Sequence, residues 1–314
     1  MTDERHAALR ERAERALAGR PVAEAVAKVR AIVFRLPLVP DAETAAQTAL
    51  DKINAGEAPT AAEMAALEMV VRMMRPAPLS QGGELEQLPS APGSSTYNPA
   101  LVDLWDRFRA GVKPIMYSIG RLEDHGGDAK GTGFLVADDL LLTNRHVLAQ
   151  LSNGVEQLDE GQAVVRFNLE WGTPEPADSS APVAGVAAIH DTLDMALLRV
   201  RLPQPRKPLV LDGDPAQRAS PVATVGYPFK DPTSPLFVEA IFNGRYGVKR
   251  AAIGDVLDVG ERRFFHDCST LGGNSGSPVF SLDSGGVAGI HCSGVFNYRN
   301  EAIPAAEIAE FVEA

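Results

Sequence analysis

Residues 272–279 read Gly-Gly-Asn-Ser-Gly-Ser-Pro-Val, and they place Ser275 in a short turn between glycines. A serine hydroxyl is a weak nucleophile until a neighbouring base accepts its proton. The glycines let the backbone turn tightly enough for the amides of Gly273 and Ser275 to converge on one oxyanion. This octapeptide therefore indicates a fold and a function only if the rest of the chain supplies a base and a group that orients it.

Two upstream segments supply these groups. Residues 142–147 read Leu-Thr-Asn-Arg-His-Val, and residues 191–198 read Asp-Thr-Leu-Asp-Met-Ala-Leu-Leu. His146 is the candidate general base, and a carboxylate on its far ring nitrogen would fix its tautomer. Asp194 and Asp191 are both candidates for that role. Each segment alone is common in proteins, and only the three together indicate a nucleophilic serine with its base and orienting carboxylate.

The order His146, Asp194, Ser275 resembles that of the chymotrypsin superfamily. The resemblance favours Asp194 over Asp191, because Asp-Met-Ala-Leu-Leu matches the family's Asp followed by an alternating strand. Together with Gly131-Thr-Gly-Phe-Leu-Val, the Gly-Asn-Ser-Gly-Ser-Pro form is similar to bacterial glutamyl endopeptidases and related trypsin-like peptidases. The resemblance covers roughly residues 112–314. It implies an all-β, two-barrel serine endopeptidase domain with a C-terminal helix, working through an acyl-enzyme, with Gly273 and Ser275 as the oxyanion hole.

The residue pattern after position 112 agrees with that class of fold. Short runs of Val, Ile and Leu are broken by Gly, Pro, Asp and Asn at intervals of roughly ten residues, which is typical of a barrel or sandwich. A last helix is expected over residues 304–312.

The resemblance also implies a substrate pocket. In glutamyl endopeptidases the residues that correspond to His291 and Thr270 contact the substrate's glutamate, so cleavage after Glu is the leading expectation. The alternative is that His291 only forms a wall of the pocket. The full set of expected substrate-binding residues is Ser269, Thr270, His291, Cys292, Ser293 and Gly294. Cys292 replaces an aromatic residue that is usual in that family.

The first part of the chain has a different pattern. Residues 1–78 predict a small all-α bundle of about four helices, with a capping box at Thr60 and Glu63. One helix is expected after Pro21, with apolar residues recurring up to Leu36. Residues 79–98 are rich in Pro, Gly and Ser and predict a flexible linker, and residues 99–314 form the expected protease domain, opened by a helix after Asn98.

The net charge and the composition limit the classes of partner that this protein is expected to bind. The formal net charge of -11 disfavours nucleic acid and anionic membranes as partners, because both require clustered Lys and Arg. The charged start of the chain and the lack of a long apolar run favour a cytoplasmic location. Cys268 and Cys292 are the 2 cysteines, expected to be reduced. Two thiols lack the further ligands that zinc needs, so no metal and no cofactor are expected.

Two other classes of function remain open at this point. A protease-like barrel could serve only as an interaction module joined to the helical adaptor, or the same triad could hydrolyse small esters. A helical bundle on a cytosolic protease is also similar in architecture to bacterial defence and signalling effectors, in which such a domain recruits a protein partner. Residues 1–78 would hold that role here, as a regulatory or adaptor domain.

Overall fold

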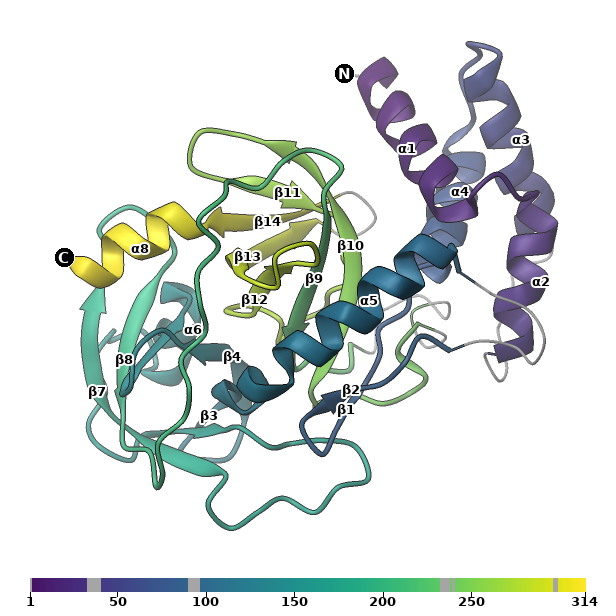
Figure 1. Ribbon diagram of the computed structural model, residues 1–314. Helices are drawn as coiled ribbons and strands as arrows, with labels where there is room; N and C mark the ends of the chain where they lie inside the picture. Colours follow the sequence, from purple (N-terminus) through teal and green to yellow (C-terminus); the bar gives the residue numbers. More distant parts are fainter. Residues whose placement is uncertain (1, 33–40, 90–96, 232–237, 239–240, 296–298) are drawn as a thin grey trace. The chain divides into compact units, whose positions relative to one another are not determined.

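Two closed barrels of β-strands follow one another along the chain in the computed structural model (Figure 1), which describes residues 2–32, 41–89, 97–231, 238, 241–295 and 299–314. The strands of the first barrel pair in the order β3-β4-β5-β8-β7-β6, and those of the second in the order β10-β11-β14-β13-β12-β9. The first barrel comprises β3 (Ile119–Asp124), β4 (Ala129–Leu135), β5 (Leu140–Thr143), β6 (Ala163–Arg166), β7 (Ser180–Ile189) and β8 (Ala196–Val200). The second comprises β9 (Pro221–Gly226), β10 (Arg250–Val259), β11 (Phe264–His266), β12 (Pro278–Ser281), β13 (Val287–Val295) and β14 (Arg299–Pro304).

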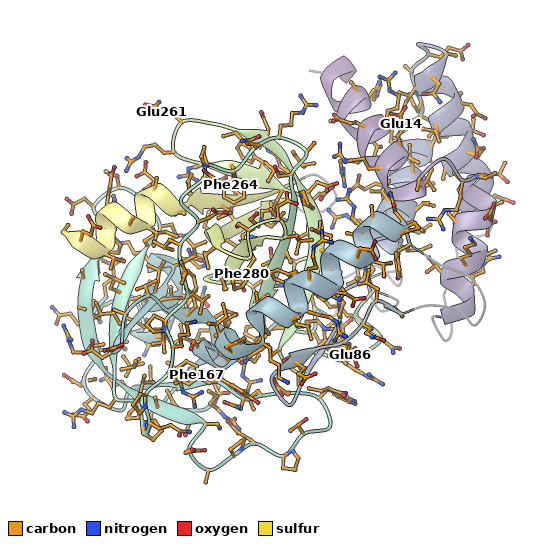
Figure 2. All side chains as sticks on the ribbon, viewed as in Figure 1. Glu14, Glu86, Phe167, Glu261, Phe264 and Phe280 are labelled. Carbon is orange, nitrogen blue, oxygen red and sulfur yellow. The ribbon has the colours of Figure 1, made fainter. Side chains whose placement is uncertain are left out.

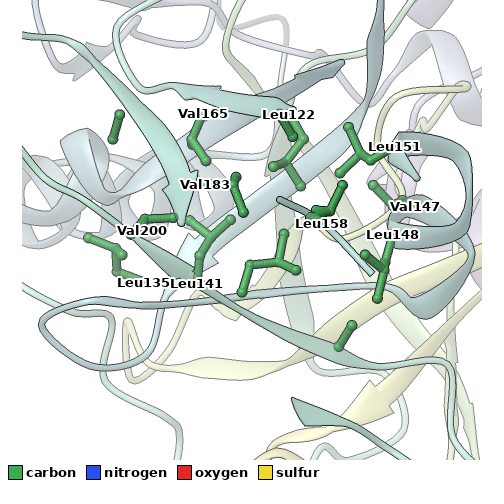
Figure 3. Packing of buried hydrophobic residues seen from close by; sticks show 14 of the residues in the cluster. Leu122, Leu135, Leu141, Val147, Leu148, Leu151, Leu158, Val165, Val183 and Val200 are labelled. Carbon is green, nitrogen blue, oxygen red and sulfur yellow. The ribbon is translucent and has the colours of Figure 1, made fainter. Parts of the chain in front are cut away.

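The first barrel closes around aliphatic side chains that alternate along its strands. In β6 the residues Ala163 and Val165 are fully buried, while their neighbours are only half-buried. A period of two points every second side chain to one face, so a closed sheet gathers one set in its interior. Figure 3 shows this cluster, in which Leu122, Leu141 and Val183 are each 0% exposed. The helix α6 (Arg145–Leu151) adds further side chains to the same core.

The core of the second barrel includes aromatic side chains. Phe264 and Phe280, which Figure 2 labels, are fully buried. The ring of Phe280 meets the ring of Phe108 edge to face, with centroids 5.6 Å apart. Phe108 lies on α5 (Pro99–Val112), which continues as the 3-10 helix η1 (Lys113–Ser118) into β3. The expected C-terminal helix is α8 (Ala305–Glu313), with Ile308 fully buried. The expectation of an all-β two-barrel fold preceded by helices is confirmed.

Four helices make up most of the first part of the chain: α1 (Thr2–Leu17), α2 (Val22–Ile32), α3 (Ala42–Asn54) and α4 (Ala61–Met73). Thr60 caps α4, accepting from the Glu63 amide while the Glu63 carboxylate accepts from the Thr60 amide, the expected capping box. Inside the bundle Glu68 accepts from both terminal nitrogens of Arg12 at 2.8 Å and from Arg72 at 3.0 Å. The expected continuation of the second helix to Leu36 lies outside the described residues.

Residues 80–85 form a β-hairpin. Its strands are β1 (Ser80–Gln81) and β2 (Glu84–Leu85), joined by Gly82 and Gly83, whose φ angles are 58° and 77°. Two consecutive positive φ angles are typical of a type I′ hairpin turn, which favours Gly-Gly. The buried carboxylate of Glu170 accepts the Gly83 amide at 3.0 Å and so ties the turn down.

The chain therefore divides differently from the expected boundaries at 1–78, 79–98 and 99–314. One compact unit holds Met1–Ala77, Gln87–Trp105 and Pro232–Gly244; the other holds Pro78–Glu86, Asp106–Asp231 and Arg245–Ala314. The expectation of a linker was wrong for residues 79–86, because Leu79 and Leu85 bury their side chains and the Ser80 amide donates to the Lys249 carbonyl at 3.0 Å. Residues 90–96 of that expected linker lie outside the described part. Among the described residues, no helix has the length and apolar character needed to cross a bilayer.

Candidate active site

His146 and Asp194 lie together at one end of the first barrel. His146 is in the first turn of α6, which follows β5, and Asp194 is in the turn between β7 and β8. The Nδ1 atom of His146 is 2.6 Å from Oδ2 of Asp194, and the His146 amide donates to Oδ1 at 3.0 Å. The first amides of a helix have no partner within it, so Asp194 caps α6 while it holds the ring. The ring and its helix are thus fixed by one carboxylate.

The electrostatics of Asp194 agree with this arrangement. Burial raises its pKa, but the hydrogen bonds from the ring and the backbone of His146 outweigh burial, and the net pKa lies below the usual value. Asp191, the rival carboxylate, is exposed. The geometry therefore gives the His146 ring to Asp194.

Neighbouring side chains hold the turn that carries Asp194. Asn144 donates from Nδ2 to the Asp194 carbonyl at 2.8 Å. His190, for which the sequence suggested no role, accepts the amides of Thr192 and Leu193 on Nδ1 at 3.1 and 3.0 Å. Since a turn has few backbone partners of its own, these bonds define the position of the carboxylate.

Ser275 lies in the loop between β11 and β12 of the second barrel. The loop meets the first barrel at Gly131, where an added Cβ would lie 2.9 Å from the Ser275 carbonyl oxygen and 2.8 Å from the side chain of Val147. Val147 directly follows His146. A glycine at position 131 therefore allows the serine loop and the histidine helix to approach each other closely.

Within the part of the chain that the structure describes, the amides of Gly273 and Ser275 donate no hydrogen bond. The intervening Asn274 amide donates to the Leu271 carbonyl at 3.1 Å. Gly273 has φ of 91°, a left-handed conformation that an L side chain rarely adopts. An added Cβ there would lie 2.3 Å from the Tyr227 carbonyl oxygen, so the loop requires glycine at this point.

The side chains of the expected pocket lie on elements that flank the serine loop. Thr270 donates its hydroxyl to Oδ1 of Asn300 at 2.8 Å, and Asn300 donates from Nδ2 to the Cys268 carbonyl at 2.6 Å. Oδ1 of Asn300 also lies 2.5 Å from where a Cβ on Gly294 would be. Ser269 is 3% exposed, and its hydroxyl has no hydrogen-bond partner among the described residues. Asn300 was missed from the sequence, because only its pairing opposite Gly294 brings it here.

His291 is held beside the serine loop by its backbone. Its carbonyl accepts the Gly276 amide, and its own amide donates to the Ser277 carbonyl, both at 2.9 Å. The His291 ring is 3% exposed, and its Nδ1 lies 3.3 Å from Nε2 of His266. The sequence suggested no role for His266. Its place next to His291 follows from the pairing of both strands with β14.

Burial keeps this pair of imidazoles neutral. It lowers the pKa of His266 to about 4, an effect that Asp267 partly opposes. Burial, together with His266 and His146, also lowers the pKa of His291 well below its usual value. A neutral pair can share one proton between its facing nitrogens, which leaves an N–H on Nε2 of His291 when His266 donates. Nδ1 of His266 has no partner among the described residues, which is compatible with that tautomer.

The remaining expected pocket residues lie along β13. The strand pairs with β14 through Val295, but with β12 only up to Ile290. Ser293 and Gly294 are exposed, so on the β12 side this stretch has no strand partner within the described chain. Cys292 is buried, its thiol donates to the Glu301 carbonyl at 3.3 Å, and burial raises the thiol pKa to about 11, with Asp194 adding to the effect.

Both cysteines are free thiols in the structure. Among the described residues, no group of three or more His, Cys, Asp and Glu side chains is placed to hold a metal ion.

Comparison with known proteins places this geometry in a family. The model of the trypsin-like peptidase domain matches residues 131–290. A glutamyl endopeptidase from Staphylococcus epidermidis is 28% identical over 187 residues, which cover 57% of this chain and 59% of that protein. A probable serine protease from Lysobacter enzymogenes is 28% identical over 235 residues, covering 57% and 60% of the two chains. The chain thus spans less than two thirds of the length of these relatives.

Among solved structures, a serine endoprotease from Yersinia pestis is similar with a TM-score of 0.49 and 16% identity, over 66% of this chain and 65% of that one. A protease from M. tuberculosis in its active form gives a TM-score of 0.48 and 21% identity, over 69% and 86%. The family match extends from before His146 to beyond Ser275 and covers just over half of the sequence. This chain belongs to the trypsin-like peptidase domain family.

Proposed function

We propose that this protein is a serine endopeptidase in which Ser275 is the nucleophile, His146 the general base and Asp194 the residue that orients the base. The observation that carries the proposal is the 2.6 Å contact between His146 Nδ1 and Asp194 Oδ2 beside the Ser275 loop. Family membership adds weight to it.

The steps follow from this arrangement. Oγ of Ser275 attacks the carbonyl carbon of the scissile bond, and Nε2 of His146 accepts the hydroxyl proton. Asp194 stabilises the imidazolium that forms, and His146 then gives the proton to the leaving amine, which departs as the acyl-enzyme forms. Water, deprotonated by His146, attacks the acyl carbon and releases the acid, and the proton returns to Ser275.

The amides of Gly273 and Ser275 form the proposed oxyanion hole. Neither has another acceptor among the described residues, and the negative oxygen of the tetrahedral intermediate would supply one. The loss of one such donor typically lowers the rate by about 10²–10³-fold.

The substrate is proposed to be a peptide chain rather than a small ester. On the side away from β14, the stretch Cys292–Gly294 of β13 has no strand partner among the described residues, so an extended peptide can pair with it there. A small ester would not use this edge. Peptides of increasing length should therefore gain kcat/KM, whereas simple acyl esters should not approach the best peptide.

Glutamate is the proposed preference at the residue before the scissile bond. The side chains of the expected pocket, Ser269, Thr270, Asn300 and His291, are uncharged and polar, and His291 can offer an N–H donor on Nε2. A bound carboxylate would favour protonation of His291, because opposite charges in contact raise the pKa of an imidazole. Binding of Glu would then be linked to proton uptake, whereas binding of the uncharged isostere Gln would not.

This linkage gives a pH signature. The ratio of kcat/KM for Glu over Gln peptides should rise as pH falls from about 8.5 toward about 6, while effects on His146 cancel in the ratio. A ratio that stays constant with pH would contradict the proposed role of His291 and leave the triad untouched.

The helical unit is proposed to recruit a partner or to regulate the enzyme. Its buried ion pairs Arg12–Glu68 and Glu68–Arg72 fix one packing of α1 against α4 and give the unit a defined surface. If it regulates turnover, a chain without α1 and α2 should differ in kcat from the intact chain on the same peptide. Equal kcat values would count against regulation.

The experiment for the whole proposal is turnover of fluorogenic peptides that carry Glu, Gln, Asp, Leu or Arg before the scissile bond, with wild type and Ser275→Ala compared. Turnover of the Glu peptide that is abolished in the variant would support both mechanism and preference. Serine-dependent turnover of another peptide would retain the mechanism and reject the preference. Turnover that the variant retains would reject the mechanism.

A further inference from the structure

We propose that Thr132 is a positioning residue for the oxyanion hole: from the first barrel it fixes the two peptide carbonyls that flank the Asn274–Ser275 peptide in the serine loop. The inference rests on the proposed function. It assigns to the first barrel a part in setting the oxyanion donors, beyond supplying His146 and Asp194.

Thr132 lies on β4 and is fully buried. Its hydroxyl donates to the Gly273 carbonyl at 2.7 Å, and its amide donates to the Ser275 carbonyl at 2.8 Å. The same hydroxyl accepts the Tyr227 amide at 3.3 Å. One residue of the first barrel therefore bonds to both ends of the segment that holds the nucleophile.

These two carbonyls matter because peptide groups are planar. Fixing the Gly273 oxygen fixes the whole Gly273–Asn274 peptide plane, and fixing the Ser275 oxygen fixes the plane that follows Ser275. The peptide between them carries the Ser275 amide, and its carbonyl, that of Asn274, accepts the Ser277 amide at 2.9 Å. With the planes on both sides held, the Ser275 amide keeps a single direction.

The Gly273 amide must also keep a single direction if it is to donate to the oxyanion. It belongs to the Gly272–Gly273 peptide, whose carbonyl accepts the Phe229 amide at 2.6 Å. Gly273 itself has no side chain to restrict it, and its φ is 91°. The Thr132 hydroxyl holds the carbonyl on the far side of this glycine and thus restricts rotation about its backbone bonds.

The bonds of Thr132 also connect the loop to the histidine side of the site. The Thr132 carbonyl accepts the hydroxyl of Thr143 at 2.7 Å, and Thr143 is the last residue of β5, just before α6 and His146. Gly276 lies so close to the Thr132 carbonyl that position 276 has no room for a larger side chain, because an added Cβ would lie 2.0 Å from the carbonyl oxygen. A β-branched threonine has few accessible side-chain rotamers, which suits a fixed donor.

The test compares Thr132→Val with Thr132→Ser. Valine keeps the shape and the backbone amide but removes the hydroxyl, while serine restores the hydroxyl. The matched control is Thr224→Val on β9: Thr224 is 1% exposed, and its hydroxyl has no partner among the described residues. Thermal unfolding of all variants verifies that each is folded.

We expect Thr132→Val to lower kcat by about 10–100-fold, the range typical of residues that orient a catalytic group, with KM within about twofold. The affinity for a peptide aldehyde, which forms a tetrahedral adduct, should fall by the same factor as kcat. The affinity for the product peptide acid should stay unchanged. Thr132→Ser should recover most of kcat, and Thr224→Val should match wild type.

Three outcomes would each overturn the inference while leaving the proposed protease function intact. Thr132→Val could change KM alone, or it could lose no more kcat than Thr132→Ser does. It could also have the same kcat as Thr224→Val. Wild-type turnover that does not depend on Ser275 would overturn the proposed function, and the inference with it.

Discussion

Lys249 offers a quantitative test of how this structure handles a buried charge. It is 0% exposed and donates from Nζ to the Met116 and Phe167 carbonyls, with the rings of Tyr117 and Tyr227 each 5.9 Å away. Burial lowers its pKa from 10.5 to about 7, with Glu170 opposing the shift. In the unfolded chain the amine would keep the ordinary pKa.

The difference fixes the sign and the size of a pH effect. Below pH 7 both states carry the proton, and the full cost of the buried charge is present; above 10.5 neither does, and the cost disappears. Between these limits the unfolded state binds more protons, so stability should rise by ~1.4 kcal/mol per pH unit, ~5 kcal/mol in all.

Lys249→Met isolates this contribution, because methionine has a similar length and does not titrate. It leaves two buried carbonyls without their donor, at a cost of ~1–3 kcal/mol each that does not depend on pH. Urea unfolding from about pH 6.5 to about pH 9.5, in a Ser275→Ala background that prevents self-cleavage, would measure the difference between the two proteins. Its slope with pH is the observable.

We expect the stability of the parent to rise relative to the variant by ~1.4 kcal/mol per pH unit above about pH 7. Lys113→Met is the matched control at an exposed lysine, since the side chain of Lys113 is 56% exposed. Parallel pH profiles for parent and Lys249→Met would refute the reasoning: the two carbonyls would then hold the ammonium in its charged form despite burial.

Three other substitutions test the site and the bundle. Asp194→Asn should lower kcat by about 10⁴-fold through loss of the ring orientation, while Asp191→Asn stays near wild type on the same peptide. Gly273→Ala should abolish turnover, because φ is 91° and the new Cβ would meet a carbonyl oxygen at 2.3 Å; Gly272→Ala, with nothing within 4 Å, should retain it. Glu68→Gln should destabilise the helical unit by ~3–5 kcal/mol in calorimetry of the full chain, since it leaves buried guanidinium groups without their carboxylate; an unchanged transition would contradict this.

The two-barrel fold was predicted from the resemblance of the three motifs to the chymotrypsin superfamily, whereas the spacing of short apolar runs alone indicated a barrel or sandwich. The resemblance also led to a preference for Asp194 over Asp191, since Asp-Met-Ala-Leu-Leu resembles the family's Asp followed by a strand, and the strand after Asp194 begins at Ala196. These features depend on neighbours in sequence, so they can be read along the chain.

The surroundings of the expected substrate-binding residues could be predicted only in part. His266 and Asn300 lie on β11 and β14, and they reach His291 and Thr270 only because both β11 and β13 pair with β14. Such register is a property of the closed sheet and has no local signal. The hairpin at residues 80–85 had a signal, the Gly82-Gly83 pair between Leu79 and Leu85, but its flanking prolines and serines suggested a linker instead.

The chain passes back and forth between its two units, which limits how the gene could have been assembled from separate parts. The helical unit comprises Met1–Ala77, Gln87–Trp105 and Pro232–Gly244. The stretch Pro232–Gly244 lies between β9 and β10 in the sequence. No single break in the gene would separate the two units cleanly. A recombination event that exchanged only the first 77 residues would leave the other two stretches of that unit in place. The two units are therefore expected to be inherited together, and the helices and the stretch between β9 and β10 are expected to change together in evolution.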